Sequence, residues 1–258
     1  MALSFVSYNV NGIRAALKKG FAEWTAENQF DLICLQETKA MRDQVDMQPI
    51  EDLGYHHYWH SAEKKGYSGV AIFSKKEPDQ VITKTGIDLC DTEGRVIRAD
   101  FGDWTVLNCY FPSGTSGDIR QDIKMQFLDE FLQWAQELRK ERPKLLICGD
   151  YNIAHTKIDI HDPIGNKKSS GFLPEERAWM DKWLEAGFVD AYRHLNPEKI
   201  EYSWWSYRAN ARANNKGWRI DYLSVTENLK NTLLESRHLN QAMHSDHCPV
   251  WVNLDLTF

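Results

Sequence analysis

Short apolar runs alternate with amphipathic stretches along the chain, and the two patterns predict strands and helices. Strands are predicted at residues 3–10, 31–37, 68–75, 94–101, 104–111, 144–152, 202–207, 218–225 and 248–256. The fourth and fifth of these runs are separated only by Gly102 and Asp103, which predicts a hairpin.

Three segments have the spacing of apolar residues that predicts a helix. Residues 14–29 follow the first strand, and residues 119–140 form the longest amphipathic stretch. A third helix is predicted at residues 174–187, where Pro174 suits the first helical turn. Residues 159–171 are rich in Asp, Gly, Lys and Ser, and we expect them to form a loop.

The order of these elements differs from a plain doubly wound fold, because hairpin-like strand pairs occur together with long helices. We therefore predict an α/β fold in which two mainly antiparallel sheets pack face to face with helices outside. No linker, low-complexity tract or short-period repeat interrupts the 258 residues, so we expect a single domain over residues 1–258.

The composition is that of a soluble globular protein, with 42% hydrophobic and 26% charged residues. No apolar run approaches the roughly 20 residues of a membrane span, and we see no signal peptide. The five cysteines are scattered and form no CxxC pair, which favours buried, reduced thiols in the cytoplasm. Nothing indicates an oligomer, and we expect a monomer that does not contact a membrane.

The net charge of −6 argues against a protein coated in positive charge for nonspecific binding to nucleic acid. It leaves room for a local basic groove. Residues 202–222 could form one, because Arg208, Arg212, Lys216 and Arg219 alternate there with aromatic residues. Cations would contact phosphates and the tryptophans could face an extruded sugar, although a solvated loop over a tryptophan core is the alternative.

Polar residues collect where several predicted strands end. They are Asn9, Asn11, Glu37, Asp150 and Asn152, with Asp221 within the strand predicted at residues 218–225 and with Asp246 and His247 in the loop before the last strand. Because all are carboxylates, amides or imidazole, they suit Mg²⁺ or Mn²⁺ better than zinc, which more often recruits several His or Cys. Their recurrence after apolar runs predicts that they converge on one site.

Each of these residues can take part in phosphate chemistry. Glu37 is the candidate metal ligand, and Asn9 could orient that carboxylate or contact the ion. Asp150 could position or deprotonate an attacking water. Asn152 could donate to a phosphate oxygen, as could His247 if it is protonated.

A histidine in this role needs a carboxylate on its other ring nitrogen. Asp246 is badly placed for this, because adjacent side chains diverge in an extended chain. We expect Asp221 to orient His247, from a strand that we expect beside the last one. Asp246 then has a separate role on the same loop.

Structural interpretations also exist. Asn9 and Asn152 could simply begin turns, as Asp and Asn often do at strand ends. Tyr110 could be a core tyrosine with its hydroxyl at the surface. Cys248 beside His247 suggests a thiol nucleophile, but a buried packing cysteine is the favoured explanation. A serine hydrolase is disfavoured, because the chain has no G-x-S-x-G motif.

Eight segments together resemble the exonuclease III family of apurinic/apyrimidinic (AP) endonucleases, within the endonuclease/exonuclease/phosphatase superfamily. They are YNVNGIRA, LQETK, KGYSGVAIFS, NCYFPSG, CGDYNIAH, SGFLPEERAWM, YSWWSYRANARANNKGWRIDY and SDHCPV. They span nearly the whole chain in the order of the family. SDH or GDxN alone indicates the superfamily, whereas GYSGV with GFLPEER and GWRIDY narrows it to AP endonucleases.

The resemblance implies a four-layer α/β sandwich and a Mg²⁺-dependent phosphodiesterase, with Mn²⁺ as a possible substitute. Such an enzyme cuts double-stranded DNA 5′ to an abasic site, leaves a 3′-hydroxyl, and can trim 3′ ends. The resemblance assigns catalytic positions to Tyr110, Asp150, Asn152, Asp221, Asp246 and His247, and metal positions to Glu37, Asn9 and Asp246. Tyr110 would contact the scissile phosphate.

The resemblance also implies a DNA-binding surface. Its residues are a sugar pocket of Trp204, Trp218 and Ile220, and backbone contacts from Arg14, Lys19, Tyr67 and Asn166. Arg208 stands where some relatives insert a bulky apolar side chain into the groove. Asn11 stands where some have aspartate, and Ser113 and Ser169 replace asparagines that bind phosphate. Gly171 leaves space beside the phosphate loop, which favours continuous duplex as substrate.

Two rival functions remain open from the sequence. A phosphoesterase acting on phosphoinositide or sphingolipid head groups would share the core site but lack the basic, aromatic segment 202–222. A catalytically silent DNA-binding module is the other rival, and the presence of Glu37, Asp150 and His247 argues against it.

Overall fold

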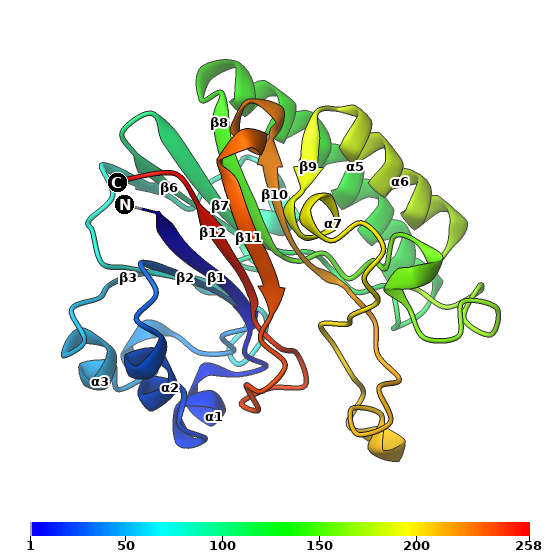
Figure 1. Cartoon of the computed structure of the whole chain (residues 1–258), viewed down its shortest axis with the longest axis horizontal. Helices are drawn as coiled ribbons and strands as arrows, with labels where there is room; N and C mark the ends of the chain where they lie inside the picture. The colour runs from blue at the N-terminus through cyan, green and yellow to red at the C-terminus, as the bar shows by residue number, and fades with distance from the viewer. Residues whose placement is uncertain (1) are drawn as a thin grey trace.

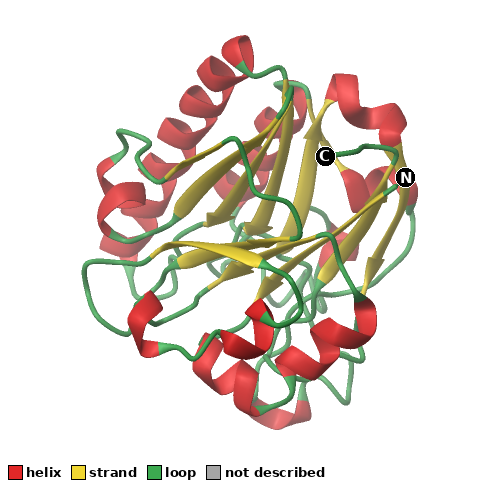
Figure 2. Cartoon of the chain, turned by 90° about the vertical axis from the view of Figure 1, so that its left-hand side faces the viewer, coloured by secondary structure: helices red, strands yellow, loops and turns green. Residues whose placement is uncertain are grey.

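The computed structural model describes residues 2–258, and it arranges them in layers. Within these residues two six-stranded sheets face each other, with helices on the outer face of each (Figures 1 and 2). Both chain ends lie on the same side of the molecule (Figure 1). The predicted four-layer α/β sandwich is therefore confirmed.

Each sheet is mixed, with one parallel pair among its neighbouring strands and antiparallel pairs elsewhere. The first has the order β11 (Leu233–His238), β12 (Val250–Leu254), β1 (Leu3–Asn9), β2 (Leu32–Gln36), β4 (Val70–Ser74), β3 (His56–His60). The second has the order β5 (Gln80–Ile82), β6 (Val96–Phe101), β7 (Trp104–Tyr110), β8 (Lys144–Asp150), β10 (Asp221–Thr226), β9 (Phe188–Asp190). The parallel pairs are β1 with β2 and β7 with β8.

The helices divide between the two outer layers. The first sheet is covered by α1 (Ile13–Lys18), α2 (Phe21–Asn28) and α3 (Gln48–Glu51), and the second mainly by α5 (Asp118–Glu141) and α6 (Pro174–Glu185) (Figure 1). Shorter helices are α4 (Asp88–Thr92) and α7 (Ala191–Leu195), with 3₁₀ turns at Arg42–Gln44, Lys157–Asp159, Arg208–Asn210 and Glu227–Thr232. No helix among residues 2–258 combines the length and apolar character needed to cross a membrane.

The central strands are apolar on both faces because both faces are covered. In β1, Phe5 packs between the sheets and Val6 packs against the helices. In β8, Leu146 faces the other sheet and Ile147 faces α5 and α6. Full burial of such a side chain stabilises the fold by about 1.5–3 kcal/mol.

A buried polar contact joins the two sheets near one end. Gln36 Nε2 donates to Asn108 Oδ1 at 2.7 Å, and Asn108 Nδ2 donates to the carbonyl oxygens of Leu35 and Ala71. Both amide side chains are fully buried. Because a buried amide must be hydrogen-bonded, this contact fixes how the sheets are placed relative to each other.

Three expectations were wrong. The helix expected at residues 14–29 is interrupted at Gly20, where φ of 88° lies in the left-handed region, and becomes α1 and α2. Residues 202–207 are not a strand, because Trp204 pairs only through isolated bridges to Trp218 and His247. The strand of Asp221 does not lie beside the last strand, since β10 and β12 belong to different sheets.

Candidate active site

Three candidate residues lie side by side at the ends of neighbouring strands in the second sheet. Tyr110 ends β7 and pairs with Asp150, which ends the parallel strand β8. Asp150 pairs with Asp221, the first residue of β10. Because β10 runs antiparallel to β8, its beginning lies at the edge where β8 ends. Strand direction and register therefore bring these side chains together.

The first sheet delivers its polar residues to the same place. Asn9 ends β1, Glu37 follows the parallel strand β2, and His247 lies in the loop that enters β12. The strand ends of the two sheets and the loops beside them enclose a cavity of about 800 Å³. Its lining includes Asn9, Asn11, Glu37, Lys39, Tyr110, Asp150, Asn152, Trp204, Trp218, Ile220, Asp246 and His247.

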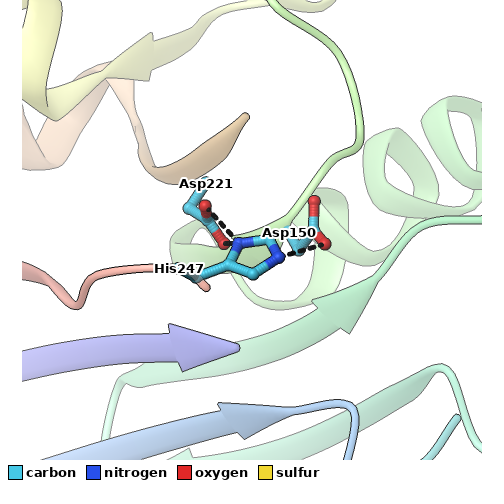
Figure 3. Close-up of side chains that lie close together, drawn as sticks. All are labelled: Asp150, Asp221 and His247. Atoms are coloured by element: carbon cyan, nitrogen blue, oxygen red, sulfur yellow. Dashed lines mark hydrogen bonds and ion pairs between the residues drawn. The ribbon is translucent and has the colours of Figure 1, made fainter. Parts of the chain in front are cut away.

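His247 is held by Asp221 and faces Asp150 (Figure 3). Its Nδ1 lies 2.9 Å and 3.1 Å from the two carboxylate oxygens of Asp221. Its Nε2 lies 3.9 Å from Asp150 Oδ2, which is an ion-pair distance too long for a hydrogen bond. The contact expected between Asp221 and His247 is present, although it crosses between the sheets. The Nε2–H group is left to donate into the cavity.

Burial and charge set the protonation of this group. The pKa of Asp150 is raised to about 7, first by burial of the carboxylate and then by repulsion from Asp221. Burial alone would lower the pKa of His247, but the negative charge of Asp221 and its hydrogen bond raise that pKa to about 10. The histidine is therefore a cation at neutral pH, and Asp150 can gain or lose a proton there.

Asp150 is fixed by an amide side chain and by a turn. Asn9 Nδ2 donates to Asp150 Oδ2 at 2.9 Å, and the backbone N–H of Asn152 donates to Asp150 Oδ1 at 2.8 Å. The same kind of turn recurs after β1, where the N–H of Asn11 donates to Asn9 Oδ1 at 3.0 Å. Both Asn11 and Asn152 have positive φ. The turn interpretation and the site interpretation therefore apply to the same residues.

Asp246 has partners other than His247. Its Oδ1 accepts from Asn11 Nδ2 at 2.9 Å, and its Oδ2 accepts from Trp204 Nε1 at 3.1 Å. Burial would raise the pKa of Asp246, but the nearby His247 charge and these two hydrogen bonds lower it below its ordinary value. Asp246 is thus an anion that links the strand-edge site to the tryptophans.

Oxygen donors near Glu37 could hold a hard divalent cation. Glu37 is partly exposed, and its Oε1 lies 3.2 Å from Lys39 Nζ, which also donates to Asn11 Oδ1 at 2.5 Å. Asn9 Oδ1 keeps a lone pair beyond its hydrogen bond to Asn11. Lys39 thus places a positive charge beside the Glu37 carboxylate.

A second group of possible metal ligands is Asp150, Asp221 and His247, whose nearest donor atoms all lie within 4.8 Å of one another. A protonated imidazole has no lone pair to give to a metal. Because His247 is cationic and bound to Asp221, this group suits proton and phosphate chemistry better than metal binding. The carboxylate of Glu37 is the better candidate for the metal.

Trp204, Trp218 and Ile220 form an apolar wall at the other end of the cavity. The two indoles meet edge to face, with ring centroids 6.1 Å apart. They pack on Ile220, which is only 6% exposed, and on Phe172. The apolar wall and the polar strand edges thus line one continuous cavity.

Tyr110 is packed against a buried arginine. The guanidinium carbon of Arg95 lies 4.8 Å from the centre of the Tyr110 ring, and its Nη1 donates to the Tyr110 carbonyl at 2.8 Å. Burial, and then the Glu37 carboxylate, raise the pKa of the Tyr110 hydroxyl well above its ordinary value. Tyr110 therefore keeps its proton and can donate it in a hydrogen bond.

The other expected DNA-binding residues, four for the backbone and Arg208 for the groove, lie in loops and short helices. Lys19 Nζ donates to the His244 carbonyl at 3.0 Å, and Tyr67 contacts Glu93 through its hydroxyl. The amide nitrogen of Asn166 donates to two carbonyls of its own loop, so in this conformation it braces that loop. Arg14 and Arg208 are exposed. None of these five is among the residues that line the cavity, within the described residues 2–258.

Sequence reasoning missed several residues that line the cavity. Lys39 lies two residues after Glu37 in the LQETK segment, so that segment could have indicated it. Lys168 and Ser170 belong to the loop expected at residues 159–171, and Gln121 faces the cavity from α5. A glutamine on a charged amphipathic helix carries no signal that separates it from surface residues.

The sequence is similar to known nucleases along nearly its whole length. Residues 6–247 match the Endonuclease/Exonuclease/phosphatase family. The chain is 47% identical over 250 residues to the exodeoxyribonuclease of Bacillus subtilis, covering 96% of this chain and 98% of that protein. It is 40% identical over 254 residues to the DNA repair nuclease APEX1 of Danio rerio, covering 96% of this chain and 81% of that protein.

The fold is also similar to a solved structure. An AP endonuclease from Archaeoglobus fulgidus superposes with a TM-score of 0.90 at 31% sequence identity. The superposition covers 98% of this chain and 100% of that one. The likeness therefore includes both sheets and the helices outside them.

Proposed function

We propose a function from one premise: the chain belongs to the endonuclease/exonuclease/phosphatase family. It is a DNA-repair phosphodiesterase, a metal-dependent hydrolase of the AP endonuclease and exodeoxyribonuclease type. We propose that its preferred substrate is double-stranded DNA with an abasic site. In this proposal it hydrolyses the backbone 5′ to that site, leaves a 3′-hydroxyl and also trims 3′ ends. It acts as a one-domain monomer in the cytoplasm.

Four side chains of the site carry out or support the hydrolysis in this proposal. Asp150 accepts a proton from the attacking water, and a pKa of about 7 is well matched to a base working near neutral pH. His247 donates its Nε2–H to a phosphate oxygen and stabilises the charge that develops there. Asp221 holds the imidazolium in orientation, and Asn9 holds the Asp150 carboxylate.

Tyr110 and Asn152 complete the contacts to the scissile phosphate. The Tyr110 hydroxyl stays protonated and donates to a phosphate oxygen. Asn152 Nδ2 donates to the Phe111 carbonyl at 2.9 Å, which leaves its second N–H for the phosphate. These donors are fixed before the substrate arrives, which is the arrangement that stabilises a transition state most.

We propose Mg²⁺, or Mn²⁺ in its place, as the metal. Glu37 would hold the ion, with Asn9 and Asp246 as further oxygen donors. When bound, such an ion stabilises negative charge on the phosphate and on the leaving oxygen.

The observation that carries the abasic preference is the apolar wall beside the catalytic residues. Trp218 and Ile220 offer a niche of rings and methyl groups that suits a sugar without a base. Trp204 joins this niche to Asp246 through its indole N–H. A sugar rotated out of the helix would thus place its phosphate at Asp150 and His247.

The test is a duplex with one tetrahydrofuran abasic analogue, incubated with the enzyme and Mg²⁺ or EDTA. We expect one cut, 5′ to the analogue and with a 3′-hydroxyl, that EDTA abolishes. The undamaged duplex and a soluble phosphoinositide head group serve as parallel substrates. Equal cutting of both duplexes would contradict the abasic preference, and hydrolysis of the head group alone would contradict the DNA substrate.

A further inference from the structure

A buried ion pair lies behind the cavity, between the two helices that cover the second sheet. Lys124 Nζ in α5 lies 2.5 Å from Glu176 Oε1 in α6, and both side chains are 0% exposed. A buried pair of this kind gives little net stability, because removing two charges from water offsets their attraction. Its position next to the active-site loops indicates another use.

Glu176 holds the loop that precedes its helix. Its Oε2 accepts from the backbone N–H of Gly171 at 2.6 Å and from that of Leu173 at 2.9 Å. Its Oε1 accepts from Gln121 Nε2 at 3.1 Å. One carboxylate therefore connects α5, α6 and the loop that lines the cavity.

Lys124 reaches the other side of the same loop. Its ammonium donates to the carbonyl oxygen of Asn152 at 2.8 Å. Asn152 has φ of 53°, in the left-handed region, which is uncommon for residues other than Gly although Asn adopts it more readily than most. The Lys124 contact supplies support from behind the site, where the substrate cannot reach.

Gly171 connects the Lys124–Glu176 network to the apolar wall, because it is bonded to Glu176 and packs closely against Trp218. A Cβ at Gly171 would lie 3.0 Å from the Trp218 ring and 3.1 Å from the Asn152 carbonyl oxygen. The Gly171 carbonyl accepts from the Ala154 N–H at 2.7 Å. Asn152, Gly171 and Trp218 are thus packed against one another, and the ion pair holds two of the three.

We propose that Lys124 and Glu176 are positioning residues, which set the placement of Asn152 against Trp218 and are not needed for folding. This inference rests on the proposed function, because it gives Asn152 and Trp218 their roles at the phosphate and the sugar. The pair acts through these residues and does not touch the substrate.

The test uses the double variant Lys124→Met with Glu176→Gln. It removes both buried charges, keeps the side-chain volumes close, and leaves the Gln carbonyl to accept from the loop. Asn152 loses its support. We expect a folded protein whose kcat on the abasic duplex falls about 10²-fold with little change in KM, the size of loss that a small misplacement can cause.

Two further measurements separate positioning from stability. Hydrogen exchange of peptides covering residues 150–155 and 169–173 should become faster, and this readout needs no activity. In an Asn152→Ala background the double change should have almost no further effect on kcat, because it acts through Asn152. The single variant Glu176→Gln leaves Lys124 unpaired and should be the least stable of the set.

Asp100→Asn is the matched control. Asp100 is also a buried acid in an ion pair, with Arg98 at 2.7 Å, but it lies at the opposite end of β6 from the site. We expect it to lower the melting temperature and leave kcat unchanged. Failure of the double variant to fold, a wild-type kcat, or an equal kcat loss in Asp100→Asn would each overturn the positioning role. A wild-type enzyme that does not cut the abasic duplex would instead refute the proposed function, and the exchange data would still report on the pair.

Discussion

The site has two parts that differ in how completely their polar atoms are already bound. The floor consists of Asn9, Asp150, Asp221 and His247, each no more than 4% exposed. The rim consists of the loops at residues 113–118, 161–171 and 206–216, of which the last projects away from the sheets (Figure 1). Floor side chains are hydrogen-bonded to one another across the two sheets.

The cations of the rim differ in this respect, because Arg212 donates to three backbone carbonyls whereas others have no such contact. Among residues 2–258 the guanidinium of Arg208 and the ammonium of Lys168 have no hydrogen-bond partner in the protein. A floor that is fixed in advance stabilises a transition state without reorganising, whereas a rim with free cations adapts to a flexible polyanion. The difference predicts that floor variants lose turnover and that rim variants lose salt-dependent affinity.

The largest effect is expected at the His247–Asp221 contact. His247→Asn and Asp221→Asn should each lower kcat severely, and the double variant should be little worse than either, because the two residues act as a unit. Loss of the orienting acid lowers kcat by about 10⁴ in serine proteases, and we expect less here because a metal shares the charge stabilisation. Single-turnover rates on the abasic duplex at saturating Mg²⁺ measure this.

Asp246 provides the matched comparison, since it is adjacent in sequence but bonded to Asn11 and Trp204. Asp246→Asn and His247→Asn should combine nearly additively. The reverse pattern, with additive losses for Asp221 and non-additive losses for Asp246, would reject the pairing as the functional one.

Glu37→Gln should have the next largest effect. It removes the charge that would hold the metal, so kcat should fall on the order of 10²–10³ and recover in part at high Mn²⁺ or Mg²⁺. A metal titration of activity measures both the loss and the recovery. An unchanged titration midpoint in the variant would mean that Glu37 is not a ligand.

Trp218→Ala tests whether the apolar wall holds the flipped sugar. Without this ring the flipped sugar would be held less precisely, so abasic-site cleavage should fall roughly 10–100-fold. Removal of a blocked 3′ end should suffer less, because it does not need the flipped sugar held in place. Equal losses on both substrates would mean that Trp218 does not hold the flipped sugar.

The dependence of activity on pH should reflect the titration of two floor residues, Asp150 and His247. Below a pH of about 7 Asp150 is protonated and cannot accept a proton, so kcat/KM should rise about tenfold per pH unit up to that value. Above a pH of about 10 His247 loses its proton, and activity should fall. Asp221→Asn removes the interaction that raises the pKa of His247, so the alkaline limb should move to lower pH.

The same contrast explains how much of the fold could be predicted from the sequence. The central strands were predicted because both faces are buried and their sequences are continuous apolar runs. The strands that were missed, β3, β5, β9 and β11, are the edge strands of the two sheets. His56–His60 reads HHYWH and is partly exposed, so its sequence carries no such signal.

Some residues of the site could likewise be identified from the sequence, and others could not. Asp150 could be identified because a polar residue at the end of an apolar run is conspicuous. The partner of His247 was identified by excluding its neighbour, although the strands involved lie in different sheets. Lys124 could not be recognised, because a lysine on a charged helix usually faces solvent, and only the position of α6 buries it.

The smallest effects are expected at the rim. Arg208→Ala and Lys168→Ala should each weaken binding of abasic duplex a few-fold at low salt and reduce the slope of log Kd against log salt by about 0.9, the value for one phosphate contact. Lys140→Ala is the control, because Lys140 is also exposed but lies at the far end of α5, paired with Glu137. Binding measured across a salt series, with kcat measured at saturating DNA, separates affinity from turnover. Because the rim cations should contact only the DNA backbone, kcat should not change. A rim variant that lowers kcat and keeps the wild-type salt slope would contradict the distinction between rim and floor.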